Sequence, residues 1–573
     1  MEVLRATAAS AGVVLGKAYI YKKPEITVKD YLISPDTIET EIEKFNEAVE
    51  TSRKQITGIA DQTLKNMGMD KAKIFYAHLE ILDDPVMEES VLDKIKLEYK
   101  NALFSLFETK KDMCAMLSAL PDEYFRERVV DVEDVFNRIM CNIQGVSPET
   151  LADLPEQSIV VANDLTPSAT AAIDSAKVLA FVTETGGRTS HSAIMARSME
   201  IPAVVGLTGA CNKIANGDFI IVDGSDGVVV CNPNEETIDV YQKIKNKFLA
   251  DKLALLRILH EEAVTADGRK IELCANIGNP KDTKGVIDNN GEGIGLFRTE
   301  FLYMDSVRFP SEEEQFVAYK KVAHVMAGRP VIIRTLDIGG DKDLPYFNFP
   351  KETNPFLGYR AIRICLDRPD IFKVQLRAIL RASAFGKLRI MLPMVISLEE
   401  LRAAKEILKE CEFELKSENI AFDENIETGI MVETPAAVIM AEAFAKEVDF
   451  FSIGTNDLTQ YTLAVDRGSE SIGRLFNSYN PAVLKSIKMV IEAAHKEGKF
   501  VGMCGEFAGD EKAVPLLLGL GLDEFSVSAS SLLKVKKTIR NWNYSDAQAL
   551  AEAVLRLVTP AEVENFLNSR MMR

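Results

Sequence analysis

The sequence has few of the features that mark secreted, membrane-spanning or zinc-binding proteins. Its 573 residues include one Trp, five His and eight Cys, and no two of the cysteines form a Cys-x-x-Cys pair. That scatter is typical of reduced thiols and argues against a disulfide framework or a zinc site. No stretch approaches the roughly 18 uninterrupted apolar residues that span a bilayer, and the N-terminus lacks the apolar run of a signal peptide. We therefore expect a cytoplasmic protein without membrane insertion.

Positive charge is also in short supply. Lys and Arg number 67 against 86 Asp and Glu, so the formal net charge is −19 at pH 7. Because nucleic-acid phosphates bind to basic faces, we expect no nucleic-acid partner, whereas a basic protein partner fits this charge. The apolar content of 47% is ordinary for globular protein. At about 150 residues per domain, the length predicts three or four domains.

Two kinds of pattern alternate in the first 233 residues. Residues 1–33 are short, β-like and glycine-containing, whereas residues 34–143 have apolar residues at three- and four-residue steps, which predicts a helical bundle. Residues 144–233 return to short strands, expected at 158–162, 178–182, 219–222 and 227–230. We expect the two β-like segments to form one α/β domain into which the bundle is inserted.

The second half of the chain alternates strands with helices. It is preceded by a linker, residues 234–264, in which residues 234–262 lack Gly and Pro and predict a helix of roughly 40 Å. Alternating strands and helices over residues 265–573 predict a (β/α)8 barrel, so the fold class is multidomain α/β. The eight expected strands are residues 271–277, 293–298, 331–335, 359–364, 388–394, 428–433, 450–455 and 500–505.

Polar residues stand at the C-terminal ends of these strands, where barrel enzymes place their active sites. Guanidinium groups bind phosphate and carboxylate, and paired carboxylates are common ligands of Mg²⁺, so this set predicts a site for a polyanion with a divalent cation. One such arginine taken alone is more often part of a surface salt bridge, and a lone cysteine is more often an inert core thiol. The set is Asn276, Arg298, Arg334, Arg360, Glu433, Asn456, Asp457 and Cys504.

One histidine stands out from the other four. His191 follows a glycine turn, Gly186-Gly187, at the point where a strand ends and a helix begins. The free N–H groups and positive dipole of a helix N-terminus favour a phosphate, and a neutral imidazole is a competent nucleophile. His191 is therefore a candidate for phosphorylation. The other histidines lie in amphipathic helical segments, where a satisfied or solvated side chain is the default: His78, His260, His324 and His495.

The segments around His191 and along the barrel resemble a known family. Residues 186–191 (GGRTSH) and 201–206 (IPAVVG) are similar to the phosphohistidine swivelling domain of phosphoenolpyruvate-utilising enzymes. The closest resemblance is to Enzyme I of the bacterial sugar phosphotransferase system, the phosphoenolpyruvate–protein phosphotransferases, with one mild difference in the Ser-Ala pair after His191. Matching barrel segments follow in order at residues 295–302, 334–342, 354–360, 454–461 and 502–506.

The resemblance implies a reaction and a set of roles. The phosphoryl group of phosphoenolpyruvate would pass to His191 and then to a histidine of the small phosphocarrier protein HPr, releasing pyruvate. Glu433 and Asp457 would bind Mg²⁺, and Cys504 would protonate the enolate. The helix of residues 234–262 is the natural hinge between the histidine and the substrate. The resemblance also places Thr170 and Arg188 near the phosphohistidine, and assigns substrate binding to Arg298, Arg334, Lys342, Asn354, Arg360, Asn456 and Arg467.

The same resemblance implies that HPr docks on the helical bundle and that the barrel forms a homodimer. Residues 34–98 contain 15 Asp and Glu against 8 Lys and Arg. An acidic helical face of this kind is by itself just as well a solvated surface, but it suits a basic partner. The candidate docking residues are Asp70, Asp83 and Asp84.

Two other functions remain open from the sequence. A pyruvate phosphate dikinase or phosphoenolpyruvate synthase shares the swivelling and barrel domains, but it needs a large nucleotide-binding domain where this chain has a helical bundle of about 110 residues. A sensor or scaffold that kept the fold without activity is a different class. The intact His191, Glu433, Asp457 and Cys504 argue against it.

Overall fold

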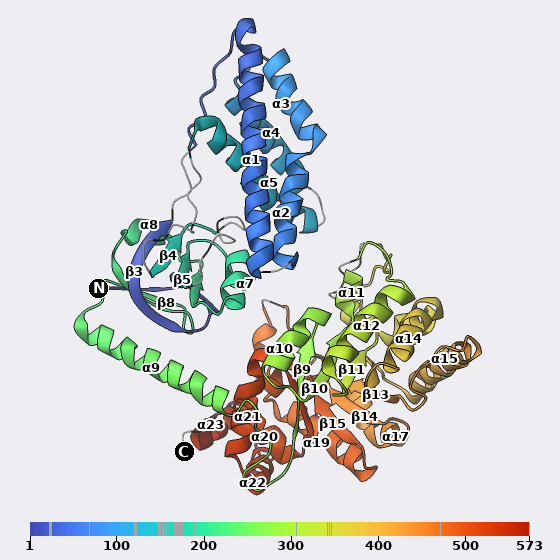
Figure 1. The fold of residues 1–573 in the computed structure, drawn as a ribbon. Helices are drawn as coiled ribbons and strands as arrows, with labels where there is room; N and C mark the ends of the chain where they lie inside the picture. Colours follow the sequence, from blue (N-terminus) through green and yellow to red (C-terminus); the bar gives the residue numbers. More distant parts are fainter. Residues whose placement is uncertain are drawn as a thin grey trace. The chain divides into compact units, whose positions relative to one another are not determined.

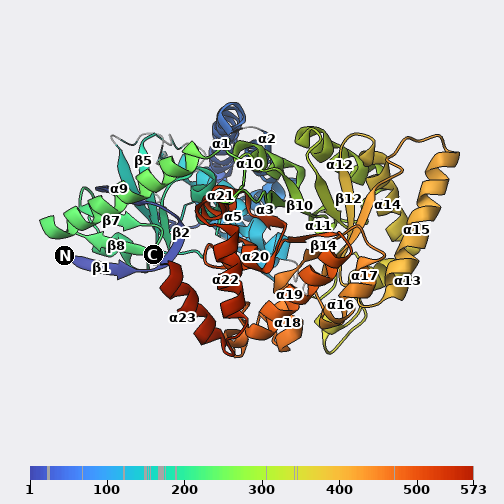
Figure 2. The same cartoon turned by 90° about the horizontal axis from the view of Figure 1, so that it is seen from below.

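The chain folds into two compact units, Met1–Lys252 and Leu253–Arg573, drawn from two directions in Figures 1 and 2. The computed structural model describes every residue except 22–25, 68, 120–122, 147–150, 152–153, 155–156, 166–168, 170–172, 174–175, 188–189, 305, 341, 343, 345, 470 and 572–573. Within the described part, no helix combines the length and the apolarity that crossing a membrane requires.

The first unit contains an eight-stranded mixed sheet in the order β1-β8-β7-β3-β4-β5-β6-β2. Its central strand β3 is parallel to β4 and antiparallel to β7, so segments from before and after the bundle pair directly. This pairing is the one expected if the helical bundle is inserted between strands of a single sheet. The strands are β1 (Glu2–Arg5), β2 (Thr7–Ser10), β3 (Val13–Tyr21), β4 (Ser158–Ala162), β5 (Val178–Thr183), β6 (Ala203–Val205), β7 (Phe219–Asp223) and β8 (Val228–Cys231).

Five helices form the bundle, and Figure 1 shows them side by side. Ser34 precedes a short 3₁₀ turn, Pro35–Thr37, that leads into the first of them, and Asn101 caps α4 by accepting from the Phe104 N–H. The rings of Phe45, Phe75 and Phe136 are buried between the helices. The helices are α1 (Ile38–Met67), α2 (Met69–Leu82), α3 (Pro85–Leu97), α4 (Ala102–Ser118) and α5 (Glu123–Gln144).

The linker helix is shorter than its sequence predicts. Helix α9 runs over Glu235–Arg257, whereas the absence of Gly and Pro predicted a helix to residue 262. The carbonyl of Leu259 accepts hydrogen bonds from Asn290 Nδ2 and Lys536 Nζ, both at 3.0 Å. These bonds, which lie within the second unit, take the place of helical ones, so tertiary contact overrides local propensity here.

The second unit contains the predicted parallel barrel, closed by pairing of its last strand with its first. Most of its strands are buried on both faces, as expected for a parallel sheet covered by helices. The strands are β9 (Glu272–Ile277), β10 (Gly293–Arg298), β11 (Val331–Arg334), β12 (Leu388–Leu392), β13 (Glu427–Val432), β14 (Phe450–Ile453), β15 (Phe500–Met503) and β16 (Glu524–Val527).

One predicted barrel strand is wrong. Residues 359–364 are not a strand, because helix α13 begins at Ile362 and buries Ile362, Ile364 and Cys365. A short apolar run fits a buried helix as well as a strand, which is why the pattern misled. The missing strand is β16, a four-residue segment that closes the barrel against β9.

Helices surround the barrel strands (Figures 1 and 2). They are α10 (Thr283–Asp288), α11 (Glu300–Met304), α12 (Glu312–Met326), α13 (Ile362–Asp367), α14 (Pro369–Ser383), α15 (Leu398–Ser417), α16 (Pro435–Ile439), α17 (Ala441–Ala445), α18 (Thr455–Leu463), α19 (Pro481–Lys496), α20 (Ala513–Leu520), α21 (Leu532–Asn541), α22 (Tyr544–Val554) and α23 (Pro560–Met571). In the first unit, α7 (His191–Ser198) and α8 (Ala210–Lys213) lie beside the sheet.

Candidate active site

A cavity of about 540 Å³ opens at the C-terminal ends of the barrel strands. Nine residues that the sequence predicted for the site line it together: Arg298, Arg334, Lys342, Arg360, Glu433, Asn456, Asp457, Arg467 and Cys504. The predicted Asn354 is not among the lining residues; it is exposed and precedes the 3₁₀ turn Pro355–Leu357.

Two acidic residues that the sequence did not single out organise the cations of this cavity. Glu300 Oε1 accepts from Arg334 Nη2 at 2.5 Å and from Lys342 Nζ at 2.9 Å. Asp337 lies 3.0 Å from Arg334 and 2.8 Å from Lys342. Both carboxylates are almost fully buried. They hold two cations toward the cavity, because a buried guanidinium or ammonium group needs a nearby anion.

Asp337 also binds the third buried cation. Arg360 Nη2 donates to Asp337 Oδ1 at 2.9 Å, and its Nη1 donates to Tyr461 Oη at 3.1 Å. Burial alone raises the pKa of Asp337, but the charges of Arg334, Lys342 and Arg360 outweigh it and hold this pKa well below its ordinary value. Asp337 is therefore ionised throughout the working pH range.

The two carboxylates predicted to bind a metal lie at the same mouth. Glu433 follows β13, and its Oε2 accepts from the Met394 N–H at 2.8 Å. Asp457 is in the first turn of α18, and its Oδ1 is a buried oxygen with no hydrogen-bond donor among the described residues. Burial, together with the charges of Asp457 and Asp337, raises the pKa of Glu433 to about 8. Two buried carboxylates with an unsatisfied oxygen fit a divalent cation.

Cys504 lies just after β15 on the same cavity. Its side chain is 3% exposed, and burial raises the pKa of the thiol to about 11. Ser452 Oγ donates to Cys504 Sγ at 3.5 Å, and Asn276 Nδ2 donates to the Cys504 carbonyl at 3.0 Å. Asn276, expected at the mouth, therefore supports the backbone that carries the thiol. The thiol stays protonated at neutral pH.

Backbone shape at this mouth depends on Gly505. A Cβ at this position would lie 1.7 Å from Thr455 Oγ1, a distance that no side chain can accept. The glycine lets the turn after Cys504 pass close to the start of α18. The turn thus brings Cys504 to the same mouth as Asn456 and Asp457, which α18 carries.

The remaining lining arginines are less enclosed. Arg298 ends β10 and is half-buried. Arg467 follows α18; its side chain is 34% exposed, and its Nη1 lies 3.7 Å from Asp457 Oδ1. Half-exposed arginines at a cavity rim can rotate to contact an anion, whereas the buried Arg334 and Arg360 are already held in position.

Sequence reasoning missed Glu300, Asp337 and Tyr461. Glu300 stands two residues after Arg298, and Asp337 three residues after Arg334. Their closeness to predicted cations was the available signal, but an acidic residue beside an arginine is too common to single out. Tyr461 contacts Arg360 across 101 positions of sequence, and no local pattern indicates such a contact.

His191 is the first residue of α7. Ser190 caps this helix by accepting from the Ala193 N–H at 3.4 Å. Gly186 has a φ of +99°, and a Cβ there would lie 2.8 Å from Ser190 Oγ, so the turn requires glycine. The predicted neighbours Thr170 and Arg188 lie outside the described residues.

The three acidic candidates for docking lie along the bundle. Asp70 is in α2. Asp83 is exposed and forms an ion pair with Arg53 of α1, and Asp84 caps α3 by accepting from the Val86 N–H at 2.9 Å. Asp84 therefore has a structural duty that is independent of any partner.

Three family models, each describing one domain of the phosphoenolpyruvate-utilising enzymes, match successive parts of the chain. Residues 5–128 match the N-terminal part of phosphoenolpyruvate-utilising enzymes, residues 154–227 their mobile domain, and residues 254–544 their phosphoenolpyruvate-binding domain.

Curated relatives match over nearly the whole length. The chain is 50% identical over 564 residues to a phosphoenolpyruvate-protein phosphotransferase of Staphylococcus carnosus, covering 98% of both chains. It is 49% identical over 567 residues to the enzyme of the same name from Bacillus subtilis, covering 99% of both. A solution structure of Enzyme I is 43% identical, covering 43% of this chain and 99% of that chain, with a TM-score of 0.40. The chain therefore belongs to the phosphoenolpyruvate-utilising enzymes and, among them, to the phosphoenolpyruvate-protein phosphotransferases.

Proposed function

We propose that this enzyme moves the phosphoryl group of phosphoenolpyruvate to His191 and then to a histidine of the phosphocarrier HPr, releasing pyruvate. The observation that carries the proposal is the cavity at the barrel mouth, where cationic groups surround a pair of buried carboxylates. Phosphoenolpyruvate has a phosphate and a carboxylate, and so needs several cations. The cavity offers Arg298, Arg334, Lys342, Arg360 and Arg467.

The cationic side chains of the cavity differ in burial, and we assign them different roles on that basis. Arg334 and Lys342, held by Glu300 and Asp337, are fixed before substrate arrives. Such preorganised charges stabilise developing negative charge without reorganising during the reaction. Arg298 and Arg467, which are less enclosed, are suited to close on the carboxylate or phosphate of the arriving substrate. Asn456 supplies a neutral polar contact at the same mouth.

Glu433 and Asp457 are the residues proposed to hold Mg²⁺. The metal would supply positive charge against the phosphate and enolate oxygens as the phosphoryl group leaves. In its absence, burial and the neighbouring carboxylates keep the pKa of Glu433 at about 8. The protein thus places two carboxylates, those of Glu433 and Asp457, where a divalent cation could bind to both.

Cys504 is proposed as the proton donor to the enolate carbon. A general acid must be protonated before it acts, and the pKa of about 11 keeps this thiol protonated at neutral pH. Asn276 and Ser452 hold the thiol and its backbone on the cavity. The C–H bond of pyruvate forms as the S–H bond breaks, and solvent returns the proton to sulfur.

His191 accepts the phosphoryl group through an imidazole nitrogen. The N-terminus of α7 favours the negative charge of the phosphoryl group on His191, because the free N–H groups and the positive end of the helix dipole attract an anion. Transfer from a substrate in the second unit to a histidine of the first requires His191 to be brought to the cavity. We include in the proposal a docking site for HPr on the bundle of residues 34–143 and homodimerisation through the barrel.

The test is incubation of the full chain with labelled phosphoenolpyruvate and Mg²⁺, followed by mass measurement and mapping of the modified residue. One acid-labile phosphate on His191 is expected, and none on His191→Ala. His324→Ala is the matched control, because His324 is an exposed histidine of α12 on the barrel unit. Undiminished labelling of the His191 variant would overturn the assignment.

The docking surface has its own test. Asp83→Lys is expected to slow phosphoryl exchange with phosphorylated HPr most at low salt, where screening is weakest. Asp84→Asn keeps the cap and removes only the charge. Asp112→Lys, an exposed acid of α4, is the control for overall charge. Equal rates for Asp83→Lys and wild type across salt concentrations would move the docking face elsewhere.

A further inference from the structure

A second cluster of ionisable side chains lies at the opposite, N-terminal end of the barrel. There β16 pairs with β9 to close the barrel, and in that register Glu524 stands directly opposite Glu272. Cys274 is two residues further along β9, on the same face of the strand. One ligand atom from each of Glu272, Cys274 and Glu524 lies within 4.8 Å of the other two.

Glu524 is the most unusual member of the cluster. It is 1% exposed, and neither of its carboxylate oxygens finds an N–H or O–H donor among the residues that the structure describes. A buried carboxylate without donors is costly, and two carboxylates placed opposite each other across neighbouring strands repel. Among the described residues no N–H or O–H donor relieves this arrangement, and burial raises the pKa of Glu524 to about 8.

The neighbouring strands β10 and β15 have glycines at the positions that face Glu524 and Cys274. A Cβ at Gly295 of β10 would lie 2.3 Å from Glu524 Oε1, and one at Gly502 of β15 would lie 2.9 Å from the same atom. A Cβ at Gly293 would lie 2.9 Å from Cys274 Sγ. Three glycines on two strands thus leave room for the carboxylate and the thiol inside the barrel.

One buried cation lies close to the cluster. Burial raises the pKa values of both Glu272 and Glu524, that of Glu524 to about 8, and the charge of Arg389, on β12, only partly opposes this rise. It is already paired with Glu427 and lies over the Phe500 ring at 4.7 Å. Its Nη1 also lacks an acceptor among the described residues, so Arg389 and Glu524 do not satisfy each other. Arg389 therefore does not neutralise the cluster, and Glu524, with its pKa raised by burial to about 8, is mostly protonated at neutral pH.

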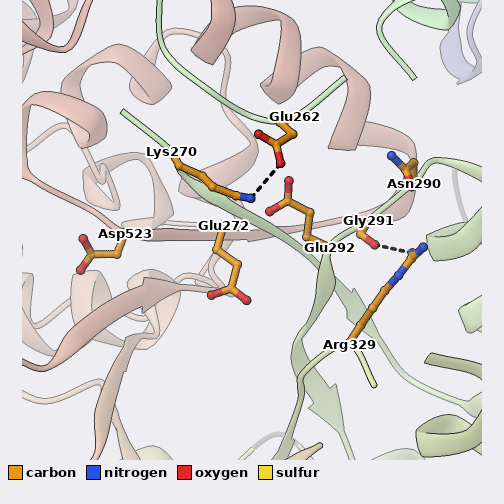
Figure 3. Close-up of a pocket in the computed structure, with 8 residues that line it drawn as sticks. All are labelled: Glu262, Lys270, Glu272, Asn290, Gly291, Glu292, Arg329 and Asp523. Atoms are coloured by element: carbon orange, nitrogen blue, oxygen red, sulfur yellow. Dashed lines mark hydrogen bonds and ion pairs between the residues drawn. The ribbon is translucent and has the colours of Figure 1, made fainter. Parts of the chain in front are cut away.

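The cluster connects to solvent through a pocket. Glu272 is one of eight residues lining a pocket of about 600 Å³ at this end of the barrel (Figure 3). The two cationic residues that line this pocket bind groups other than Glu272. Lys270 Nζ contacts Glu262 at 3.0 Å, and Arg329 Nη1 donates to the Gly291 carbonyl at 2.7 Å. Figure 3 shows Glu272 pointing away from the Lys270–Glu262 pair. The acidic rim offers a cation a route to Glu272.

We propose that Glu272, Cys274 and Glu524 form a binding site for one divalent cation of the thiophilic, zinc-like class, which joins the first and last strands of the barrel. Carboxylate oxygens and a thiolate sulfur are accepted ligands of Zn²⁺ at about 2.0–2.3 Å, and small side-chain rotations within the 4.8 Å cluster reach that geometry. On binding, the S–H proton leaves to solvent as the metal–sulfur bond forms. The site is separate from the proposed Mg²⁺ ligands Glu433 and Asp457, which lie at the other end of the barrel.

The first experiment uses Co²⁺ as a spectroscopic probe for thiolate ligation. The full chain is stripped with a chelator, desalted and titrated with Co²⁺, and the thiolate-to-metal charge-transfer band is recorded. The Cys504→Ala background removes the one thiol at the other cavity. We expect the band to persist in Cys504→Ala and to be lost when Cys274→Ala is added. Cys365→Ala, another fully buried barrel cysteine, is the matched control and should keep it.

The second experiment measures Zn²⁺ content and thermal unfolding of the same proteins. About one equivalent of Zn²⁺ should remain on the Cys504→Ala chain after desalting and raise its unfolding temperature, because a ligand that binds the folded state stabilises it. Both effects should be lost in Cys274→Ala and in Glu524→Gln. A cobalt band or zinc content unchanged by Cys274→Ala, or no metal retained by the Cys504→Ala chain, would overturn the proposal. Because Cys274→Ala shortens a side chain without adding charge, it remains informative if Glu524→Gln fails to fold.

Discussion

The two ends of the barrel both bury carboxylates, but they compensate them differently. At the C-terminal mouth, Glu300 and Asp337 are matched by Arg334, Lys342 and Arg360 at 2.5–3.0 Å. At the N-terminal end, Glu524 has no N–H or O–H donor among the described residues. Carboxylates paired with cations hold those cations ready for an anionic substrate, whereas buried carboxylate oxygens without a donor, such as those of Glu524 here and Asp457 Oδ1 at the mouth, can bind a metal ion.

The two ends also differ in where their side chains originate. At the C-terminal mouth they come from strand ends and the loops that follow, as with Arg298 and Arg467, which can adjust to a ligand. At the N-terminal end Glu272, Cys274 and Glu524 lie within the strands themselves. Chemistry in (β/α)8 barrels is concentrated at the C-terminal face, and the opposite face contributes stability. Paired substitutions at the two ends test whether they have separate roles.

The largest expected effect is at the proposed magnesium ligands. Glu433→Gln should lower the rate of phosphorylation by phosphoenolpyruvate by about 10³-fold, because it removes charge that positions the cation. Phosphorylation from phosphorylated HPr should persist, since that reaction does not use the barrel cavity. Glu524→Gln, at the other end, should leave the forward rate within about two-fold of wild type. Equal losses in both variants would mean that the two ends do not have separate duties.

The two cysteines offer the next comparison. Cys504→Ala should slow pyruvate formation by about 10²-fold or more while the dissociation constant for phosphoenolpyruvate stays nearly unchanged, because a general acid acts after binding. Cys274→Ala should leave both quantities unchanged. Single-turnover pyruvate release and equilibrium binding measure them separately. Weakened binding with normal chemistry in Cys504→Ala would make that thiol a binding group.

A smaller effect is expected on stability. Asp337→Asn should lower the free energy of unfolding by about 3 kcal/mol, because it leaves Arg360 and part of Arg334 buried without their anion. Glu524→Gln in the metal-free protein should change it far less, since the nearby cation Arg389 is paired with Glu427 and no described N–H group donates to Glu524. Urea unfolding of the barrel unit, followed in the full chain at matched pH, measures both. A larger loss in Glu524→Gln would reverse the comparison.

The smallest effect concerns pH. Burial raises the pKa of Cys504 to about 11, so the protonated donor persists below that pH and is lost only as pH rises through it. Pyruvate formation should therefore show no fall assignable to this thiol between about pH 7 and pH 9. The thiolate absorbance of wild type minus Cys504→Ala checks this directly. A difference signal appearing near the ordinary cysteine pKa would contradict the burial argument.

Most of the predicted residues that line the barrel cavity stand at strand ends in the sequence. Arg298, Glu433 and Cys504 were found because parallel strands end at one mouth and polar residues follow them. Arg360 was assigned to a strand that does not exist; it precedes helix α13, yet it reaches the same cavity. The right residue in the wrong element shows that a motif can locate a side chain even when the local pattern misidentifies its backbone.

The order of the parts could be predicted from local sequence pattern: strands, a helical bundle between them, a linker helix and a barrel. The sequence also singled out His191 and the cationic residues, because turn glycines, apolar periodicity and motif spacing are local properties. Three features became visible only in the folded chain: β16 closes the barrel, Asp337 binds three cations, and Glu524 stands opposite Glu272. Those pairings join residues as much as 252 positions apart, and they depend on burial and charge balance, which no local pattern records.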